Sequence, residues 1–326
     1  MSEILDLATA NLMSPIVLSF VLGMAAALGR SDLSIPEAVA KGMSIYLLFA
    51  IGFKGGASVA AHGLDSALVL ALVAGVVLSF ALPFVAFALL QVMTGLSRLD
   101  AAAVAGHYGS ISIVTFVAAT AVLADRGIAA EGYMVAVAAA MEAPAILAAL
   151  WLASRGGSER GGIDPTLWRE ILLNGSIVLL LGAFAIGWAT GDEGLDQIAP
   201  FIVSPFKGVL CLFLLDMGLV AGRGLRGAAG VLRSGLLGFG VIMPLAGSLA
   251  GLAAALGLGL STGGTVLLMV LAASASYIAV PAAMRVALPE ANPSIYLTLS
   301  LGVTFPFNLT LGIPVYVALA RMATGG

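Results

Sequence analysis

The segment GHYGSIS, residues 106–112, places glycine, histidine, tyrosine and serine in the middle of an apolar run that extends from 101 to 123. Backbone groups without hydrogen-bond partners are costly in hydrocarbon, so this segment favours a helix interrupted where protein, water or a ligand satisfies them. The N-terminus of the second half-helix would present N–H donors and partial positive charge to an anion. Gly109, Ser110 and Ser112 are therefore candidate anion-binding residues. The alternative is a continuous helix whose small residues pack against a neighbour.

A second segment of the same kind, ASASYIAVP at 273–281, lies in a later apolar run. Ser274 and Ser276 can cap freed N–H groups, and Pro281 lacks the N–H donor that a continuous helix needs. Two interruptions of similar composition favour a shared binding site over close packing in each run.

His107 lies three residues before Ser110, which would place a histidine base and a serine nucleophile on one helical face. A hydrolase also needs a group that orients the base and an oxyanion hole, and the motif provides neither. The sequence therefore predicts that the protein is not an enzyme. His62, Tyr108 and Trp188 are predicted to be packing or interfacial residues.

Three ionisable residues, Lys54, Glu142 and Asp216, stand inside apolar runs. Charges at such positions are costly and usually face a cavity or one another. Lys54 and Asp216 could form an ion pair, with either a structural or a transport role. Glu142, two residues before Pro144, could ligate a cation, carry a proton, or accept a hydrogen bond from nearby backbone.

The composition is that of an all-α integral membrane protein. Of 326 residues, 61% are hydrophobic and only 10% charged, whereas about a quarter of the residues in soluble domains are charged. The net charge of −3 and the absence of basic clusters argue against nucleic acid as a partner. The single cysteine, Cys211, excludes an intrachain disulfide, and the acidic Glu3 and Asp6 predict no cleavable signal peptide.

A hydrocarbon core about 30 Å thick needs about 20 apolar residues per helix, and this length divides the chain into about ten spans. The polar stretch 154–170 contains glycines, a proline and charges, and is predicted to be a cytoplasmic linker between residues 1–153 and 171–326. The predicted spans are 14–29, 40–60, 66–93, 101–123, 133–153, 171–190, 200–221, 234–258, 264–288 and 295–320.

The two halves resemble each other at offsets of about 161 to 166 positions. LFAIGFKGG at 48–56 matches LLDMGLVAG at 214–222, and GSISI at 109–113 matches ASASY at 273–277. Because five spans is an odd number, the second copy would enter the membrane from the opposite side. Such an inverted repeat is typical of secondary transporters, whose substrates bind near the midplane at interrupted helices.

Lysine and arginine concentrate in the connections that follow odd-numbered spans, which predicts a cytoplasmic location for those connections. Arg126 and Arg321 are the clear exceptions. Both termini are therefore predicted to lie outside a cell (inner) membrane that the chain crosses many times.

The run from 271 to 320 has a serine-rich break, then Pro281, Arg285 and the turn PEANPS at 289–294. This order resembles the sodium-dependent bicarbonate transporters first known from cyanobacteria. The similarity covers essentially the whole chain apart from the linker. Earlier family motifs are matched by Gly52, Gly55, Gly56, Gly109, Ser110, Ser112, Met141, Glu142 and Pro144.

The resemblance implies ten membrane helices in two inverted five-helix repeats, as in the bile-acid sodium symporters, and a homotrimer. Helices 1, 2, 6 and 7 would form a gate domain and helices 3–5 and 8–10 a core domain, with broken helices 4 and 9 crossing at their breaks. Sodium (Na+) would bind near Ser274, Ser276 and Gly55. The implied bicarbonate-binding residues are Gly109, Ser110, Ser112, Ser274, Ser276, Ala279 and Val280.

Cyanobacterial members carry an aspartate, interpreted as a sodium ligand, where this chain has Tyr277, and an uncharged polar residue where it has Lys54. Lys54 could supply the positive charge that sodium brings elsewhere. The linker is short, so the resemblance does not by itself imply docking of a PII-like regulator. The predicted function is secondary active import of bicarbonate. The alternatives are transport of another small anion or carboxylate with different coupling, or an anion channel. The candidate coupling residues are Lys54, Glu142, Asp216 and Tyr277.

Overall fold

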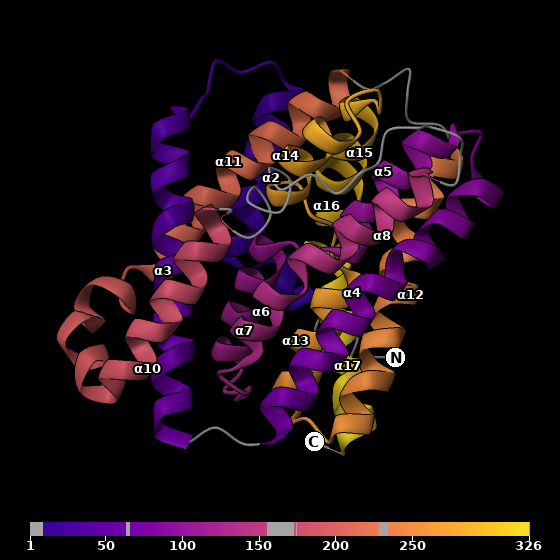
Figure 1. Cartoon of the computed structure of the whole chain (residues 1–326). Helices are drawn as coiled ribbons and strands as arrows, with labels where there is room; N and C mark the ends of the chain where they lie inside the picture. Colours follow the sequence, from indigo (N-terminus) through magenta and orange to yellow (C-terminus); the bar gives the residue numbers. More distant parts are fainter. Residues whose placement is uncertain (1–8, 63–65, 155–172, 174, 228–233, 326) are drawn as a thin grey trace.

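The computed structural model describes residues 9–62, 66–154, 173, 175–227 and 234–325 (Figure 1). These residues form helices and no strands, and eight helical segments are long and apolar enough to cross a membrane. The protein is therefore a multi-pass helical membrane protein. His62 lies at the end of a described helix, whereas the predicted linker lies outside the described residues apart from Ser154.

Each predicted span corresponds to one helix or to a series of shorter ones. The continuous helices are α2 (Pro15–Leu28), α3 (Glu37–His62), α4 (Ser66–Met93), α10 (Gly175–Ile202), α11 (Phe206–Gly227) and α12 (Ser234–Leu258). The interrupted ones are α5 (Arg98–Gly109) with α6 (Ile113–Asp125), α7 (Met134–Ala140) with α8 (Glu142–Ser154), α13 (Thr262–Ala273) with α14 (Ala279–Ala287), and α15 (Pro293–Leu299), η1 (Ser300–Thr304), α16 (Phe305–Phe307), η2 (Asn308–Gly312) and α17 (Ile313–Thr324).

The sixth span is predicted to end at 190, and α10 has a kink directly after this position. Gly191 has non-helical angles, with a φ of 59° and a ψ of −150°, and a second helical segment follows it to Ile202. This positive φ is accessible to glycine without a steric penalty. The π-helical turns η1 and η2 in the last span have no counterpart in the sequence prediction, and turns of this kind often occur at functional sites.

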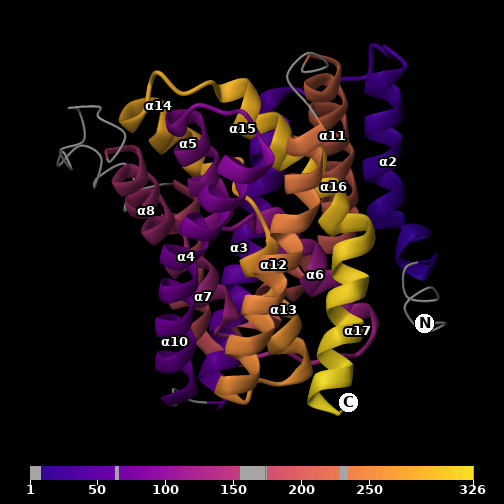
Figure 2. The ribbon, with the colours of Figure 1, turned by 90° about the vertical axis from the view of Figure 1, so that its right-hand side faces the viewer.

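The helices pack in two groups (Figures 1 and 2). In the first, α3 runs along α10, α2 runs along α11, and α3 also contacts α11. In the second, α4 packs against α5 and α8, while α12 packs against α13 and α4, and α13 packs against α17. Helix α6 joins the second group through α13 and touches α3 of the first, so it lies where the two groups meet.

Glycine makes the close helix contacts of the first group possible. A Cβ atom on Gly56 of α3 would lie 2.0 Å from the Phe184 carbonyl oxygen of α10. A Cβ atom on Gly218 of α11 would lie 2.1 Å from the Phe20 carbonyl oxygen of α2. Small residues at membrane helix interfaces allow such approach of the backbones. Both helix pairs therefore pack closely because a glycine of one helix contacts the backbone of the other.

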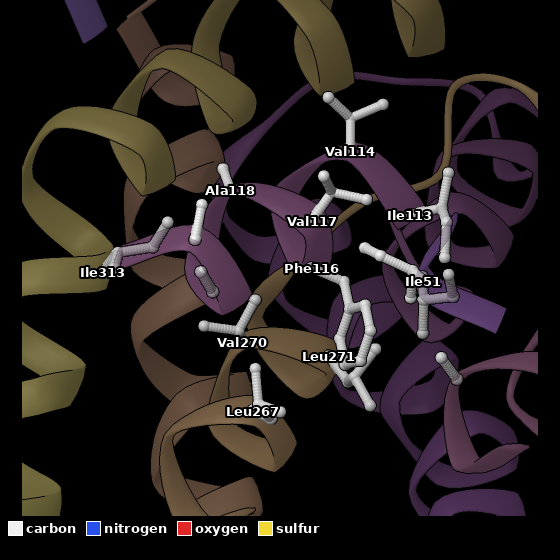
Figure 3. Close-up of a cluster of buried hydrophobic side chains, with 14 of the residues drawn as sticks. Ile51, Ile113, Val114, Phe116, Val117, Ala118, Leu267, Val270, Leu271 and Ile313 are labelled. Carbon is white, nitrogen blue, oxygen red and sulfur yellow. The ribbon is translucent and has the colours of Figure 1, made fainter. Parts of the chain in front are cut away.

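The central helices α6 and α13 are buried on nearly all sides. Figure 3 shows Phe116 and Val117 of α6 among Val270 and Leu271 of α13, with Ile51 of α3 beside them. Interiors at this packing density resist displacement. The positions at which these two helices end are therefore fixed by the surrounding core.

We expect Gly56→Ala to lower the melting temperature of the detergent-solubilised protein, measured by loss of the monodisperse peak in size-exclusion chromatography after heating. The added methyl group would overpack against α10, which typically costs about 1–3 kcal/mol. The matched control is Gly182→Ala on the exposed face of α10, where nothing lies within 4 Å of the added atom. There the melting temperature should stay the same or rise slightly. Equal stability of the two variants would contradict the packing argument.

Candidate functional site

The two polar segments form breaks in the helices and meet each other. Helix α5 ends at Gly109 and α6 begins at Ile113, while α13 ends at Ala273 and α14 begins at Ala279. The Ser112 N–H donates to Ser274 Oγ over 2.9 Å, and the Ser276 N–H donates to the His107 carbonyl oxygen over 2.8 Å. Each break thus satisfies backbone groups of the other. The structure brings together the serines predicted from both halves.

Local interactions explain why the first break falls at 110–112. The Ser110 N–H ends α5 by donating to the Gly106 carbonyl oxygen, and Ser112 caps α6 by accepting from the Thr115 N–H over 3.3 Å. A Cβ atom on Gly109 would lie 2.3 Å from Pro83 of α4. Because proline lacks an N–H, Pro83 leaves α4 locally open, and only glycine fits against it.

His107 connects the two breaks through its side chain and its backbone carbonyl group. Its Nδ1 lies 2.6 Å from the Ser276 carbonyl oxygen, and its ring stacks on Tyr296 with a centroid distance of 4.4 Å. A carbonyl oxygen only accepts hydrogen bonds, so Nδ1 carries the proton and donates it. Ser110 donates to Glu142 instead of bonding to His107. The serine–histidine pair of a hydrolase is therefore not formed.

A small pocket lies at the meeting point of the breaks. It is about 10 Å³, space for about one water molecule. It is lined by Ile111, Ser112, Ile113, Glu142, Ser276, Tyr277 and Ile278. Of the predicted anion ligands, Ser112 and Ser276 line it directly. Gly109, Ser110 and Ser274 lie behind it, since the Ser110 hydroxyl donates to Glu142 and the Ser274 hydroxyl to the Leu271 carbonyl oxygen.

The amide donors of the pocket differ in part from those that the sequence suggested. The Val280 N–H is directed at Ser276 Oγ at 3.4 Å. The amides of Ile113 and Val114, in the first turn of α6, and of Ile278 and Ala279 make no hydrogen bond to another described residue. The first N–H groups of any helix lack intrahelical partners. The serine cap at Ser112 was the signal that could have located the α6 amides in advance.

Glu142 brings a carboxyl group to the same pocket. It is buried, begins α8 directly after the interruption at Met141, and accepts from the Ser110 hydroxyl at Oε2 over 2.7 Å. Two like charges about 5 Å apart repel by about 3 kcal/mol at an effective dielectric constant of about 20. An anion can therefore occupy the pocket at low cost only when a cation or proton neutralises Glu142.

Tyr277 separates the pocket from a larger cavity. Its hydroxyl is buried beside the Ser112 side chain without a hydrogen bond of good geometry, and its ring packs edge-on against Phe305. Tyr277 and Ile278 also line a cavity of about 990 Å³ that extends to Glu37 and Lys41. The pocket thus lies at the floor of this cavity, and Tyr277 contributes no charge to it.

Lys54 and Asp216 do not form an ion pair with each other in this structure. The Lys54 amine lies 4.2 Å from the centroid of the Phe206 ring and lines a separate cavity of about 400 Å³. Asp216 is buried in α11 and forms no ion pair with it, since Lys54 faces a different space. Gly55 lines the same separate cavity, against Gly132, and not the pocket of Ser274 and Ser276.

Comparison with known proteins gives one clear match. A family model described as the Na+-dependent bicarbonate transporter superfamily matches residues 15–321. The match includes both breaks and every residue that lines the pocket. No curated protein matches the chain.

We expect His107→Phe to lower the melting temperature in detergent while the aromatic stack on Tyr296 is kept. The buried Ser276 carbonyl oxygen would lose its side-chain donor, which costs about 1–3 kcal/mol. Tyr108→Phe is the matched control, because it removes a neighbouring hydroxyl that bonds to Thr304 and leaves the bonds between the breaks intact. An unchanged melting temperature in His107→Phe would show that the hydrogen bond between the His107 side chain and Ser276 does not hold the breaks together.

Proposed function

The chain belongs to the Na+-dependent bicarbonate transporter superfamily, and we propose that it imports bicarbonate together with sodium ions by alternating access. Membership of this family makes the protein a membrane transporter and not an enzyme. The observation that carries the finer proposal is the pocket between the breaks, which combines amide donors, serine hydroxyls and one carboxyl group.

The pocket has the chemistry that a small oxyanion requires. The unpaired amides of Ile113 and Val114 point from the N-terminus of α6, and this end of a helix favours negative charge. The hydroxyls of Ser112 and Ser276 add donors from both breaks. We propose these groups as direct ligands of bicarbonate. Gly109, Ser110, Ser274, Ala279 and Val280 would hold the ligands in place or contribute backbone groups.

Glu142 supplies a reason for sodium dependence. A bound sodium ion would neutralise the repulsion between this carboxylate and the anion, so each ion would increase the affinity for the other. Tyr277, Lys54 and Asp216 fit this role less well, because Tyr277 is uncharged and the other two do not line the pocket. The Glu142 carboxylate and the serine oxygens are the oxygen donors that a hard cation prefers.

The proposed architecture is ten membrane helices in two inverted five-helix repeats. Equivalent features support it: Ser97 caps α5 and Ser261 caps α13, and Pro83 lies inside α4 as Pro244 lies inside α12. The helix pairs α2–α11 and α3–α10 would form the gate domain. The remaining helices would form a core domain that carries the pocket and moves against the gate.

The larger cavity indicates which way this conformation faces. It includes Glu37 and Lys41, near the connection between the first two spans, and the charge pattern assigns that connection to the cytoplasm. The structure would therefore represent an inward-facing state in an inner membrane, with both termini outside. A homotrimeric assembly is proposed from the family resemblance alone.

Purified protein in liposomes should accumulate labelled bicarbonate when an inward sodium gradient is imposed. Uptake should saturate with bicarbonate concentration, because each transport cycle passes through a bound state. Proton gradients, chloride and small carboxylates serve as comparisons. Accumulation driven equally by a proton gradient, or preferred uptake of another anion, would contradict the proposed substrate and coupling. Non-saturating flux with single-channel currents would identify an anion channel.

Glu142→Gln should remove the sodium dependence of bicarbonate uptake and reduce sodium-driven accumulation at least about tenfold. The amide keeps the shape of the side chain and its capacity to accept from Ser110, but it carries no charge for sodium to neutralise. Tenfold corresponds to about 1.4 kcal/mol of lost coupling. Glu193→Gln, on the exposed part of α10, is the matched control. Sodium dependence that persists unchanged in Glu142→Gln would assign coupling to other residues.

A further inference from the structure

Two cavities of different volume follow one another along α3. At the end where α3 begins, drawn at the top of Figure 1, the cavity lined by Lys41 and Tyr277 has a volume of about 990 Å³. Further along α3, beside the start of α11, a second cavity lined by Lys54 and Lys207 has a volume of about 400 Å³. A lysine therefore stands in the lining of each cavity.

At the smaller cavity, an ion pair joins the two helix groups. Lys207 in the first turn of α11 contacts Asp125, the last residue of α6, and it is the one ion pair found among the described residues. The two side chains are 56% and 44% exposed. It connects a helix of the first group to the broken helix that carries the pocket.

The sequence repeat gives the same two charge types near the start of α3 and in the turn after α14. Lys41 of α3 and Lys207 of α11 are 166 positions apart, the offset that relates 48–56 to 214–222. Glu290, in the turn after α14, lies 165 positions after Asp125. Both Lys41 and Glu290 are exposed, and they form no ion pair with each other in this structure.

We propose that Lys41 and Glu290 are the counterpart of the Lys207–Asp125 pair, and that the two ion pairs form alternately as the transporter changes the side to which it opens. The inference rests on the alternating access proposed above. When the wide cavity closes, α3 approaches the turn after α14 and the Lys41–Glu290 pair forms. At the same time the Lys207–Asp125 pair separates and the other cavity widens.

In this proposal Lys41 has one role in each of the two states. Lys41 is the one cationic side chain among the described residues that line the wide cavity, so in the open state it attracts anions toward the pocket. In the closed state the same amine is held by Glu290. Exposed ion pairs contribute little individually, so two similar pairs at the two cavities leave the two states close in free energy. A transport cycle requires such a balance, because neither state then becomes a trap.

Other charges lie near both pairs and must be considered in any test. Glu37, one helical turn before Lys41, lines the same cavity and offers Lys41 a competing partner. Arg126 and Arg321 lie close enough to interact, and Arg126 also interacts with Asp125. A single neutral substitution is therefore less informative than a measurement of proximity or an exchange of charges.

The first test cross-links each pair in a Cys211→Ser background, which removes the single native cysteine. Lys41→Cys with Glu290→Cys, and Lys207→Cys with Asp125→Cys, are treated in liposomes with a short bis-methanethiosulfonate linker. Protection of both cysteines from a maleimide–polyethylene glycol gel shift reports the link. Both pairs should cross-link, each link should stop uptake, and reduction should restore it. The control pair Lys41→Cys with Asp192→Cys should remain unlinked.

The second test exchanges the charges. Lys41→Glu and Glu290→Lys should each lower uptake by about two- to fivefold, and the double exchange should restore at least half of the wild-type rate. Asp192→Asn, an exposed acidic residue that belongs to neither pair, should transport normally.

Absence of the Lys41→Cys–Glu290→Cys link in protein that still transports would overturn the proposal, as would a double exchange no better than the single variants. The cross-linking readout does not depend on the substrate. Links that form as expected in a protein without bicarbonate uptake would refute the proposed function and leave the alternating pairs in place.

Discussion

The structure depends on one constraint: a helix can be interrupted inside hydrocarbon only if the backbone groups that it frees find partners. Here two interruptions supply each other. The Ser112 N–H uses the Ser274 hydroxyl, and the Ser276 N–H uses the carbonyl oxygen of His107. Neither break would be satisfied in this way without the other. The buried packing of α6 and α13 holds both helices in register for these bonds.

The same constraint explains where the polar chemistry is placed. After the mutual bonds are made, backbone amides at the start of α6 and just before α14 have no partner among the described residues, and Ile113 and Ile278 of this group line the common pocket. Glu142 reaches this pocket because the fifth span is also interrupted, at Met141, whose carbonyl oxygen accepts from Ser79 over 2.5 Å. Donors for an anion and a carboxylate for a cation thus meet at the point where the backbone is least regular.

The sequence was sufficient to locate the breaks, since serine caps, Gly109 and Pro281 act on their immediate neighbours. It was not sufficient to tell which amides stay free to bind an anion. The Val280 N–H is directed at Ser276 Oγ, whereas Ser112 Oγ accepts from the Thr115 N–H and leaves the Ile113 N–H without a partner. Rotation about a helix axis is likewise a tertiary property. Lys54 and Asp216 occupy related positions in the repeat but face different spaces. Their spacing in the sequence could therefore not show whether they form an ion pair. The kink at Gly191 falls one residue after the predicted end of the sixth span, but the helical segment between Gly191 and the predicted start of the seventh span was not predicted.

Tyr277, which the resemblance places where cyanobacterial transporters carry an aspartate, has an electrostatic consequence for the proposed transport. Among the described residues lining the pocket, Glu142 is the one acidic side chain. A bound sodium ion and a bicarbonate ion neutralise each other, so the loaded pocket would keep only the charge of Glu142. The Ser110 hydroxyl and the N-terminus of α6 can stabilise a single negative charge. A second carboxylate at position 277 would require a further cation. With Tyr277, the coupling between the two ions would therefore rest on the single charge of Glu142, whose position is fixed by the geometry of the breaks.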